Sequence, residues 1–173
     1  MQYYDYDFTK ESSVAELSTL VPYKTDYVNS IYYPPTSGSF ITSGRNDYVA
    51  ALFEGYLQYP SSDYGPTFKM CVASDDLSYV YANDELIIDN GFGAYTKKCA
   101  VIKSTGLVTK MRVEFFVDRI DLLVALMIEW LLPDEAEYQP IPISAWVHPS
   151  LYQEPTTNMT EGSVSIDDAI SKD

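Results

Sequence analysis

Two adjacent aspartates, Asp75 and Asp76, interrupt a stretch of strand-like sequence near the middle of the chain. Before them, residues 68–73 alternate between large apolar side chains and smaller or charged ones, which is typical of a half-buried strand. After them, a second apolar run begins at residue 79. Two neighbouring carboxylates at a strand end repel each other unless a cation lies between them. The pattern therefore predicts two strands joined by a short acidic turn, and it suggests a metal site.

Short apolar runs separated by turn residues recur along the rest of the chain. Besides the central run, strands are predicted at residues 27–33, 47–59, 99–103, 109–117 and 122–132. The last of these also suits a buried helix, because it is rich in Leu, Ala and Met. Its neighbours are strands and Pro133 ends it, so we interpret it as a buried strand. Many short strands at regular spacing indicate an all-β sandwich or barrel.

The charge balance limits the classes of partner. The chain of 173 residues has a formal net charge of −14, with 25 acidic against 11 basic residues. Phosphate backbones and anionic lipid surfaces would repel it, so nucleic acid is not an expected partner. The same balance suits binding of divalent cations, although an acidic surface also simply favours solubility. The longest apolar run, residues 122–132, is too short to span a bilayer, so membrane insertion is not expected.

The two cysteines, Cys71 and Cys99, leave two alternatives open. They could form one bridge between strands in an oxidising compartment, or remain two small buried residues. No signal peptide is visible in residues 1–20, which are interrupted by acidic residues. A removed leader, a segment of a longer protein and an intracellular protein all fit this observation.

Enzymatic activity is not expected. The single histidine, His148, lies beside Pro149 with no nucleophile motif nearby, and nothing in the spacing of the acids selects a glycosidase pair. A glycine-rich phosphate loop and a cluster of His and Cys are absent from the sequence.

A series of motifs in the chain resembles the PA14 domain family. Residues 54–60 are similar to the family's "GyL" strand, residues 65–68 to its "ytF" strand, and residues 74–81 to its "sDDgs.lyv" segment. Later landmarks fall at residues 86–90, 104–106, 111–115, 126–130 and 141–142. No single motif is specific, but their order and spacing are. The chain departs from the pattern at Leu77, where the family often has glycine, and in the turn at residues 82–85.

The resemblance implies an all-β, PA14-like β-sandwich or barrel covering residues 27–150. Residues 1–26 are then an N-terminal arm that packs on the domain or on a neighbouring molecule, and residues 151–173 are an extended tail or linker. The resemblance also implies a non-catalytic, extracellular or cell-surface module for carbohydrate binding or adhesion, with a glycan or glycoprotein as partner. The alternative is a structural subunit of a filament, coat or surface appendage, which assembles with copies of itself through the arm.

A calcium site is the most specific implication. In the flocculin-like adhesins of the family, paired aspartates joined by a cis peptide hold Ca²⁺ together with a second loop. Carried over to this chain, the ligands are the carboxylates of Asp75, Asp76 and Asp118 and the carbonyls of Ile120 and Leu122. Calcium prefers six to eight oxygen ligands, which such a set would help to supply.

A bound sugar would complete the calcium shell with its hydroxyl groups, and Tyr79, Phe92 or Tyr95 could stack on the sugar ring. Two other interpretations remain open at this stage. The aspartates could form an ordinary turn, or Arg119 could pair with one of them in place of a metal. Of the tryptophans, Trp130 is expected in the core, whereas Trp146 could be packed or exposed.

Overall fold

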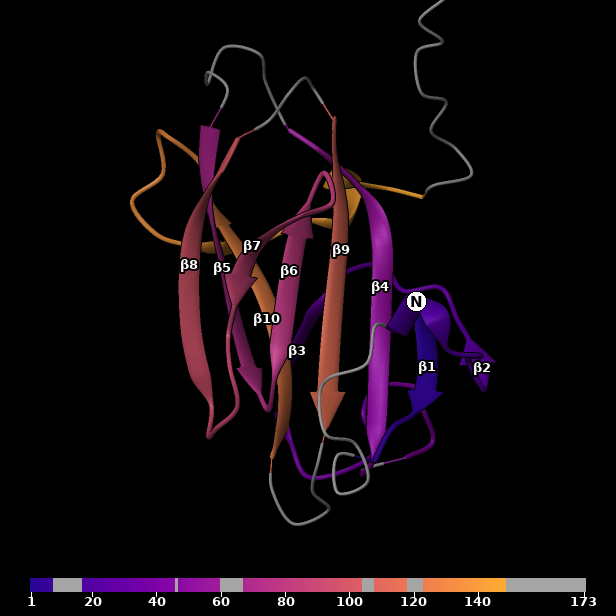
Figure 1. Cartoon of the computed structure of the whole chain (residues 1–173). Coiled ribbons are helices and arrows are strands. Elements are labelled where there is room, and N and C mark those ends of the chain that lie inside the picture. Colours follow the sequence, from indigo (N-terminus) through magenta and orange to yellow (C-terminus); the bar gives the residue numbers. More distant parts are fainter. Residues whose placement is uncertain (8–16, 46, 60–66, 104–107, 118–122, 149–173) are drawn as a thin grey trace, which may run out of the picture.

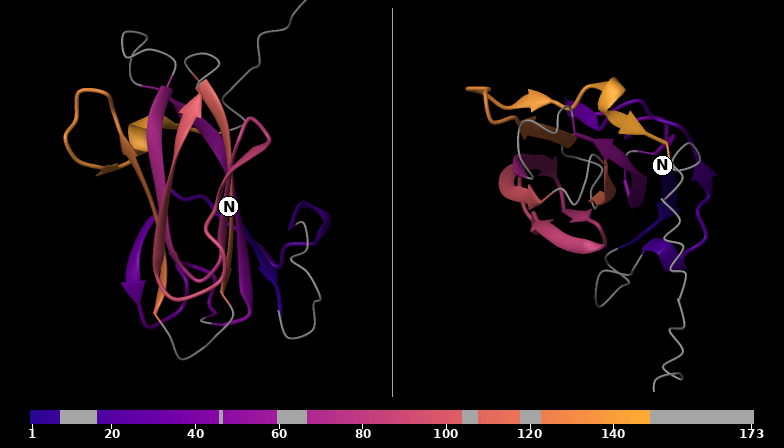
Figure 2. Two further views of the ribbon diagram at one scale, coloured as in Figure 1. Left: turned by 60° about the vertical axis from the view of Figure 1, so that its left-hand side comes forward. Right: turned by 90° about the horizontal axis from the view of Figure 1, so that it is seen from above.

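The computed structural model describes residues 1–7, 17–45, 47–59, 67–103, 108–117 and 123–148. Two antiparallel sheets pack face to face as a β-sandwich (Figures 1 and 2). The larger sheet has the strand order β2-β1-β4-β9-β6-β7, with β12 also paired to β4. The smaller sheet has the order β11-β10-β5-β8, with β3 also paired to β10. The predicted all-β sandwich is confirmed.

The strands are β1 (Gln2–Asp5), β2 (Lys24–Thr25), β3 (Tyr32–Thr36), β4 (Val49–Gln58), β5 (Thr67–Asp75), β6 (Ser78–Ala82), β7 (Glu85–Asp89), β8 (Thr96–Lys103), β9 (Val108–Val117), β10 (Val124–Leu131), β11 (Gln139–Pro140) and β12 (Trp146–Val147). Two short 3₁₀ turns, η1 (Leu17–Thr19) and η3 (Ile143–Ala145), complete the regular structure of the described residues.

Alternation along each strand builds the core between the sheets. Successive side chains of a strand point to opposite faces, so every second residue of β4, β5, β9 and β10 faces the partner sheet. On β5 these residues are Phe68, Met70 and Val72, all buried. Trp130 of β10 also lies in this core, as expected from the sequence. Burial of these apolar surfaces is the main force that holds the two sheets together.

Strand β10 settles the choice between helix and strand for the run near residue 130. Residues of β10 pair with β5 on one side and with β3 and β11 on the other. The run is therefore a central, buried strand, as predicted, because pairing on both sides outweighs the helix preference of Leu and Met. It begins at Val124, and Leu122 lies outside the described residues.

The strand predicted at residues 27–33 is displaced in the structure. Strand β3 spans Tyr32–Thr36, so it begins near the end of the predicted strand and continues through Pro34 and Pro35, residues that usually stop a strand. Proline lacks a backbone N–H, but a strand at the edge of a sheet needs partners on only one side. Among the described residues β3 pairs only with β10, so both prolines are tolerated.

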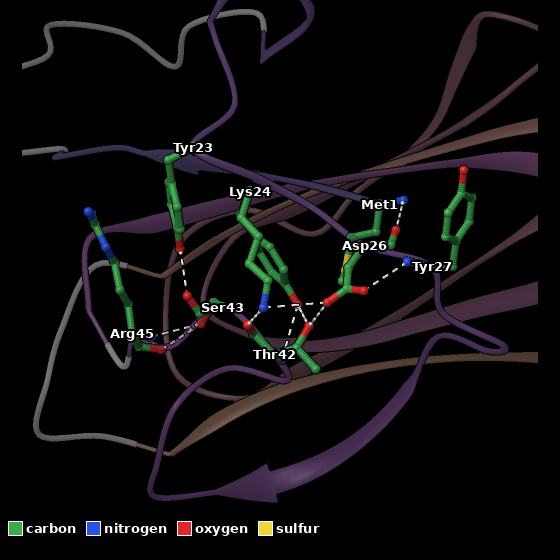
Figure 3. Close-up of polar contacts among 9 residues, drawn as sticks. Met1, Tyr23, Lys24, Asp26, Tyr27, Thr42, Ser43 and Arg45 are labelled. Carbon is green, nitrogen blue, oxygen red and sulfur yellow. Dashed lines mark hydrogen bonds and ion pairs between the residues drawn. The ribbon is translucent and has the colours of Figure 1, made fainter.

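The described part of the predicted N-terminal arm packs on its own chain. Strand β1 pairs with β4 and β2 within the larger sheet. Side chains fix this region to the loop before β4 (Figure 3): Thr42 Oγ1 donates to Asp26 Oδ2 at 2.7 Å, and Tyr23 Oη donates to the Ser43 carbonyl. The N-terminal segment also contributes to a second apolar cluster, which lies on the outer face of the larger sheet. The cluster comprises Tyr4, Tyr6, Leu17, Ala50, Leu52, Leu77 and Phe116.

A disulfide joins Cys71 on β5 to Cys99 on β8. The two residues lie directly opposite each other in the β5–β8 pairing, with Cα atoms 4.0 Å apart. Of the two alternatives for the cysteines, the structure shows the bridge. It attaches an outer strand of the smaller sheet to the strand that precedes the two aspartates.

Loss of this bridge is expected to destabilise the fold. The bond closes a loop with a sequence separation of 28 residues. A cross-link of that size removes enough entropy from the unfolded chain to contribute about 3.5 kcal/mol. We expect Cys71→Ala/Cys99→Ala to lower the free energy of unfolding by about 3 kcal/mol in urea titrations. A reductant should have the same effect on the wild type and none on the double variant; equal stability of both proteins would contradict the assignment.

Candidate functional site

The acidic turn (residues 75–77) lies at one end of the sandwich. Strand β5 ends at Asp75 and β6 begins at Ser78, so the chain reverses within two residues. The peptide bond between Asp75 and Asp76 is cis, as the resemblance implied. The Leu77 carbonyl accepts a hydrogen bond from the Phe116 N–H at 3.0 Å. The turn is therefore fixed to β9, whose arrowhead ends at the same end of the molecule as that of β5 (Figure 1).

The structure brings together two of the five predicted metal ligands. Asp75 and Asp76 are adjacent and half-buried. Asp118, Ile120 and Leu122 lie outside the described residues, as does Arg119, so their role stays a prediction.

The residues that flank this second loop are nevertheless described. Phe116, near the end of β9, bonds to the acidic turn, and Ala125, near the start of β10, lies opposite Asp75. Both ends of the loop thus lie close to the two aspartates.

A buried polar network lies next to the acidic turn and is hydrogen-bonded to its backbone. It consists of Ser74, Ser78 and Asn90, which are at most 5% exposed. Ser74 Oγ lies 2.8 Å from the Asp76 carbonyl, 2.8 Å from Ser78 Oγ and 2.7 Å from Asn90 Nδ2. Sequence reasoning missed these residues. Their signal is a small polar side chain at position 74, which continues the inward-facing series of Phe68, Met70 and Val72.

One carboxylate oxygen of the turn has no hydrogen-bond donor among the described residues. Asp75 Oδ1 is shielded from solvent, and no hydrogen-bond donor in the described part of the chain reaches it. A buried charged acceptor without a partner is costly, and a cation would remove that cost. The donor set of two adjacent carboxylates also suits a hard cation such as Ca²⁺. The described residues alone do not complete a shell, because they contain no cluster of three side chains of the metal-binding types.

An aromatic loop (residues 91–95) lies beside the acidic turn. It joins β7 to β8, and Thr96, the first residue of β8, pairs with Ser74. Phe92 is 57% exposed and Tyr95 is 47% exposed, so both rings are accessible to a ligand. Tyr79 is different: it packs edge-on against Phe116 on the outer face of the larger sheet, and burial raises the pKa of its phenol. Of the three predicted stacking residues, Phe92 and Tyr95 are the accessible ones.

Two cavities lie away from this end of the molecule. One of about 430 Å³ is lined mainly by apolar residues of β4, β9 and the segment around β12, and it includes Trp146 and His148. Another of about 510 Å³ lies beside Trp130. Neither contains a residue of the acidic turn or of the aromatic loop. Trp146 is half-buried and pairs with Leu57 of β4, which settles its position as packed.

Comparisons with known proteins identify the fold. No family model and no curated protein matches the sequence. Among solved structures, a PA14 sugar-binding domain from an RTX adhesin superposes with a TM-score of 0.64 at 15% identity, over 85% of this chain and 96% of that domain. The fold is that of a PA14 domain. The PA14 domain of the MpAFP antifreeze protein also superposes, with a TM-score of 0.54 at 11% identity, over 84% of this chain and 87% of that one.

The PA14 fold of this chain also occurs within longer proteins. Two anti-sigma factor domain-containing proteins, one of them from Clostridium clariflavum, superpose with TM-scores of 0.64 and 0.65 at 14% and 15% identity. Each match covers 84% of this chain but only 46% and 45% of the other chain. This chain thus spans about half the length of these two proteins.

The departures from the PA14 sequence pattern have local explanations. Leu77, in place of glycine, is 1% exposed and packs in the second apolar cluster. In the β6–β7 hairpin, Asn83 and Asp84 both adopt positive φ, the conformation that a two-residue hairpin turn requires. Both residue types tolerate it better than most. In the described residues no helix is long and apolar enough to cross a membrane.

Removing one charge from the acidic turn is expected to stabilise the cation-free protein. Asp75→Asn relieves the repulsion between neighbouring carboxylates and neutralises the oxygen for which the described residues offer no donor. We expect the free energy of unfolding in EDTA to rise by about 1 kcal/mol. Glu85→Gln, at an exposed position of β7, removes an equal charge and serves as the control. A lower stability of Asp75→Asn in EDTA would show that the carboxylate is satisfied within the protein.

Proposed function

We propose that this chain is a non-catalytic, calcium-dependent module for carbohydrate binding or adhesion. The observation that carries the proposal is the buried Asp75 Oδ1, which has no donor among the described residues, next to the carboxylate of Asp76. The PA14 fold supports it, because one structure with this fold is described as a sugar-binding domain of an adhesin.

In this proposal the two loops at the end of the sandwich share the ion. Asp75 and Asp76 provide carboxylate oxygens, and Asp118 adds a third carboxylate. The carbonyls of Ile120 and Leu122 complete the protein's share, and solvent or ligand oxygens fill the remaining positions. When bound, Ca²⁺ supplies a positive centre to which the hydroxyl groups of a sugar can coordinate.

The aromatic loop is the second half of the proposed ligand site. A sugar ring presents an apolar face of C–H groups, which packs well on an exposed aromatic ring. Phe92 and Tyr95 offer such rings beside the acidic turn. The proposed ligand is therefore a glycan or glycoprotein whose terminal sugar contacts the ion with its hydroxyls and the loop with its ring face.

An extracellular or cell-surface location fits the same proposal. The Cys71–Cys99 bridge is of a kind that persists in oxidising compartments. The net charge of −14 suits a medium in which calcium is abundant. The alternative of a filament subunit gains no support from the N-terminal segment, because β1 pairs with β4 of its own chain.

Calcium is expected to stabilise the wild-type protein. An ion that binds only the folded state at 100 times its dissociation constant contributes about 2.7 kcal/mol, which raises the melting temperature by several degrees. Asp75→Ala/Asp76→Ala should abolish this shift. Asp134→Ala/Glu135→Ala, which removes another adjacent acidic pair from an exposed turn, should retain it. The calcium site would be refuted if calcium did not raise the melting temperature of the wild type, or if the same rise occurred in the Asp75→Ala/Asp76→Ala variant.

Glycan binding is expected to need both the ion and the aromatic loop. On a glycan array the wild type should bind in calcium and lose its signal in EDTA. For the best-bound glycan, Phe92→Ala should weaken affinity by about fivefold, because one stacking contact contributes about 1 kcal/mol. Tyr27→Ala, which removes a ring that is 78% exposed at the rim of the 430 Å³ cavity, is the control. Binding that persists in EDTA, or equal losses in both variants, would argue against this site.

A further inference from the structure

We propose that Asn90 is a positioning residue that couples the acidic turn to the aromatic loop, so that the two halves of the site move as one unit. This inference rests on the proposed function, because it assigns Asn90 a role at the same site. Neither the acidic pair nor the exposed rings reveal it. It follows from hydrogen bonds made by a side chain that faces away from solvent.

Asn90 closes the aromatic loop at its base. The residue immediately precedes the loop, and its Nδ2 donates to the carbonyl of Thr96, which immediately follows it, at 3.0 Å. The loop therefore begins and ends at one side-chain clamp. A further bond, from the Gly91 N–H to Asp89 Oδ1 at 2.9 Å, fixes the first turn of the loop.

The same amide group reaches the acidic turn through one hydroxyl. Asn90 Nδ2 donates its second hydrogen to Ser74 Oγ at 2.7 Å. Ser74 Oγ in turn donates to the Asp76 carbonyl at 2.8 Å. Because a serine hydroxyl has a single proton, Ser78 Oγ must be the donor in its 2.8 Å contact with Ser74 Oγ. The donors Asn90 Nδ2 and Ser78 Oγ thus converge on Ser74 Oγ, whose own proton goes to the Asp76 carbonyl, while the other Nδ2 hydrogen goes to the Thr96 carbonyl.

Burial makes this path stiff. Ser74 and Ser78 are fully buried and Asn90 is 5% exposed, so the central contacts of Ser74 Oγ with Ser78 Oγ and with Asn90 Nδ2 are shielded from water, while the bonds to the Asp76 and Thr96 carbonyls are part-buried. The backbone also contributes, since the Asn90 N–H donates to the Ser78 carbonyl at 2.9 Å. A rotation of the Asn90 amide would break the contacts with Thr96 and Ser74 together. The position of the Asp76 backbone is thereby tied to that of the loop that carries Phe92 and Tyr95.

Two measurements test the coupling, and the first needs no ion. In cation-free protein, amide hydrogen exchange should become about tenfold faster in Asn90→Ala both at residues 91–95 and at residues 76–78, because one buried bond links them. Thr96→Val removes a different side-chain bond at the loop, from Thr96 Oγ1 to the Ala94 carbonyl, and should leave residues 76–78 unchanged. Faster exchange confined to residues 91–95 in Asn90→Ala would overturn the inference.

The second measurement is calcium affinity by isothermal titration calorimetry, with Ca²⁺ alone as the probe. Asn90→Ala should weaken it by about tenfold, the usual effect of removing a residue that orients a metal ligand. Ile102→Val, a core substitution on β8 remote from the network, lowers stability without touching the site and should keep wild-type affinity. Unchanged affinity in Asn90→Ala, or an equal loss in Ile102→Val, would overturn the inference.

The two measurements also separate this inference from the proposed function. If the wild type binds no calcium, the proposed function fails, while hydrogen exchange still decides whether Asn90 couples the two loops. If Asn90→Ala does not fold, Ser74→Ala interrupts the same path from the other side and should change the same readouts in the same direction.

Discussion

The period of two along β5 is the constraint on which the rest of the structure depends. One face of this strand contributes Phe68, Met70 and Val72 to the core, and the next residue in that series is Ser74. The opposite face carries Cys71 and ends at Asp75. A single alternation therefore supplies the apolar contact between the sheets, the bridge to β8 and the buried hydroxyl beneath the acidic turn. A shift of register by one residue would lose all three.

The parts of the fold that could be predicted from sequence are those governed by local alternation. Strands β4, β9 and β10 are long and apolar on the core side. Their pairing partners show the same alternation of apolar and polar residues: β4 pairs with β9, and β10 pairs with β5. The misplaced strand β3 shows where this reasoning stops. Whether Pro34 and Pro35 end a strand depends on how many neighbours that strand has, which is a property of the whole sheet.

The candidate site divides in the same way. The adjacent acidic pair is visible in the sequence, because two neighbouring carboxylates repel each other and therefore call for an explanation. Whether Cys71 and Cys99 meet was not visible, since that depends on the register between β5 and β8. Asn90 could not be found either, because its two acceptors, Ser74 and the Thr96 carbonyl, come from elements that only the folded sheet brings together. Function depends on such details of a site, so the fold alone does not determine it.

The Cys71–Cys99 bridge has a consequence for the proposed ligand site. Cys71 lies four residues before Asp75, and Cys99 lies four residues after Tyr95. The acidic turn and the aromatic loop are thus connected by a short covalent path as well as by the Asn90 amide. If an adhered ligand were to pull on the loop, the load would pass through the sulfur atoms into the middle of the smaller sheet. Strand β8 could then not separate from β5 before the ligand dissociates. The force that the complex withstands would be set by the contacts with the ligand and not by the pairing of β8 at the edge of the sheet.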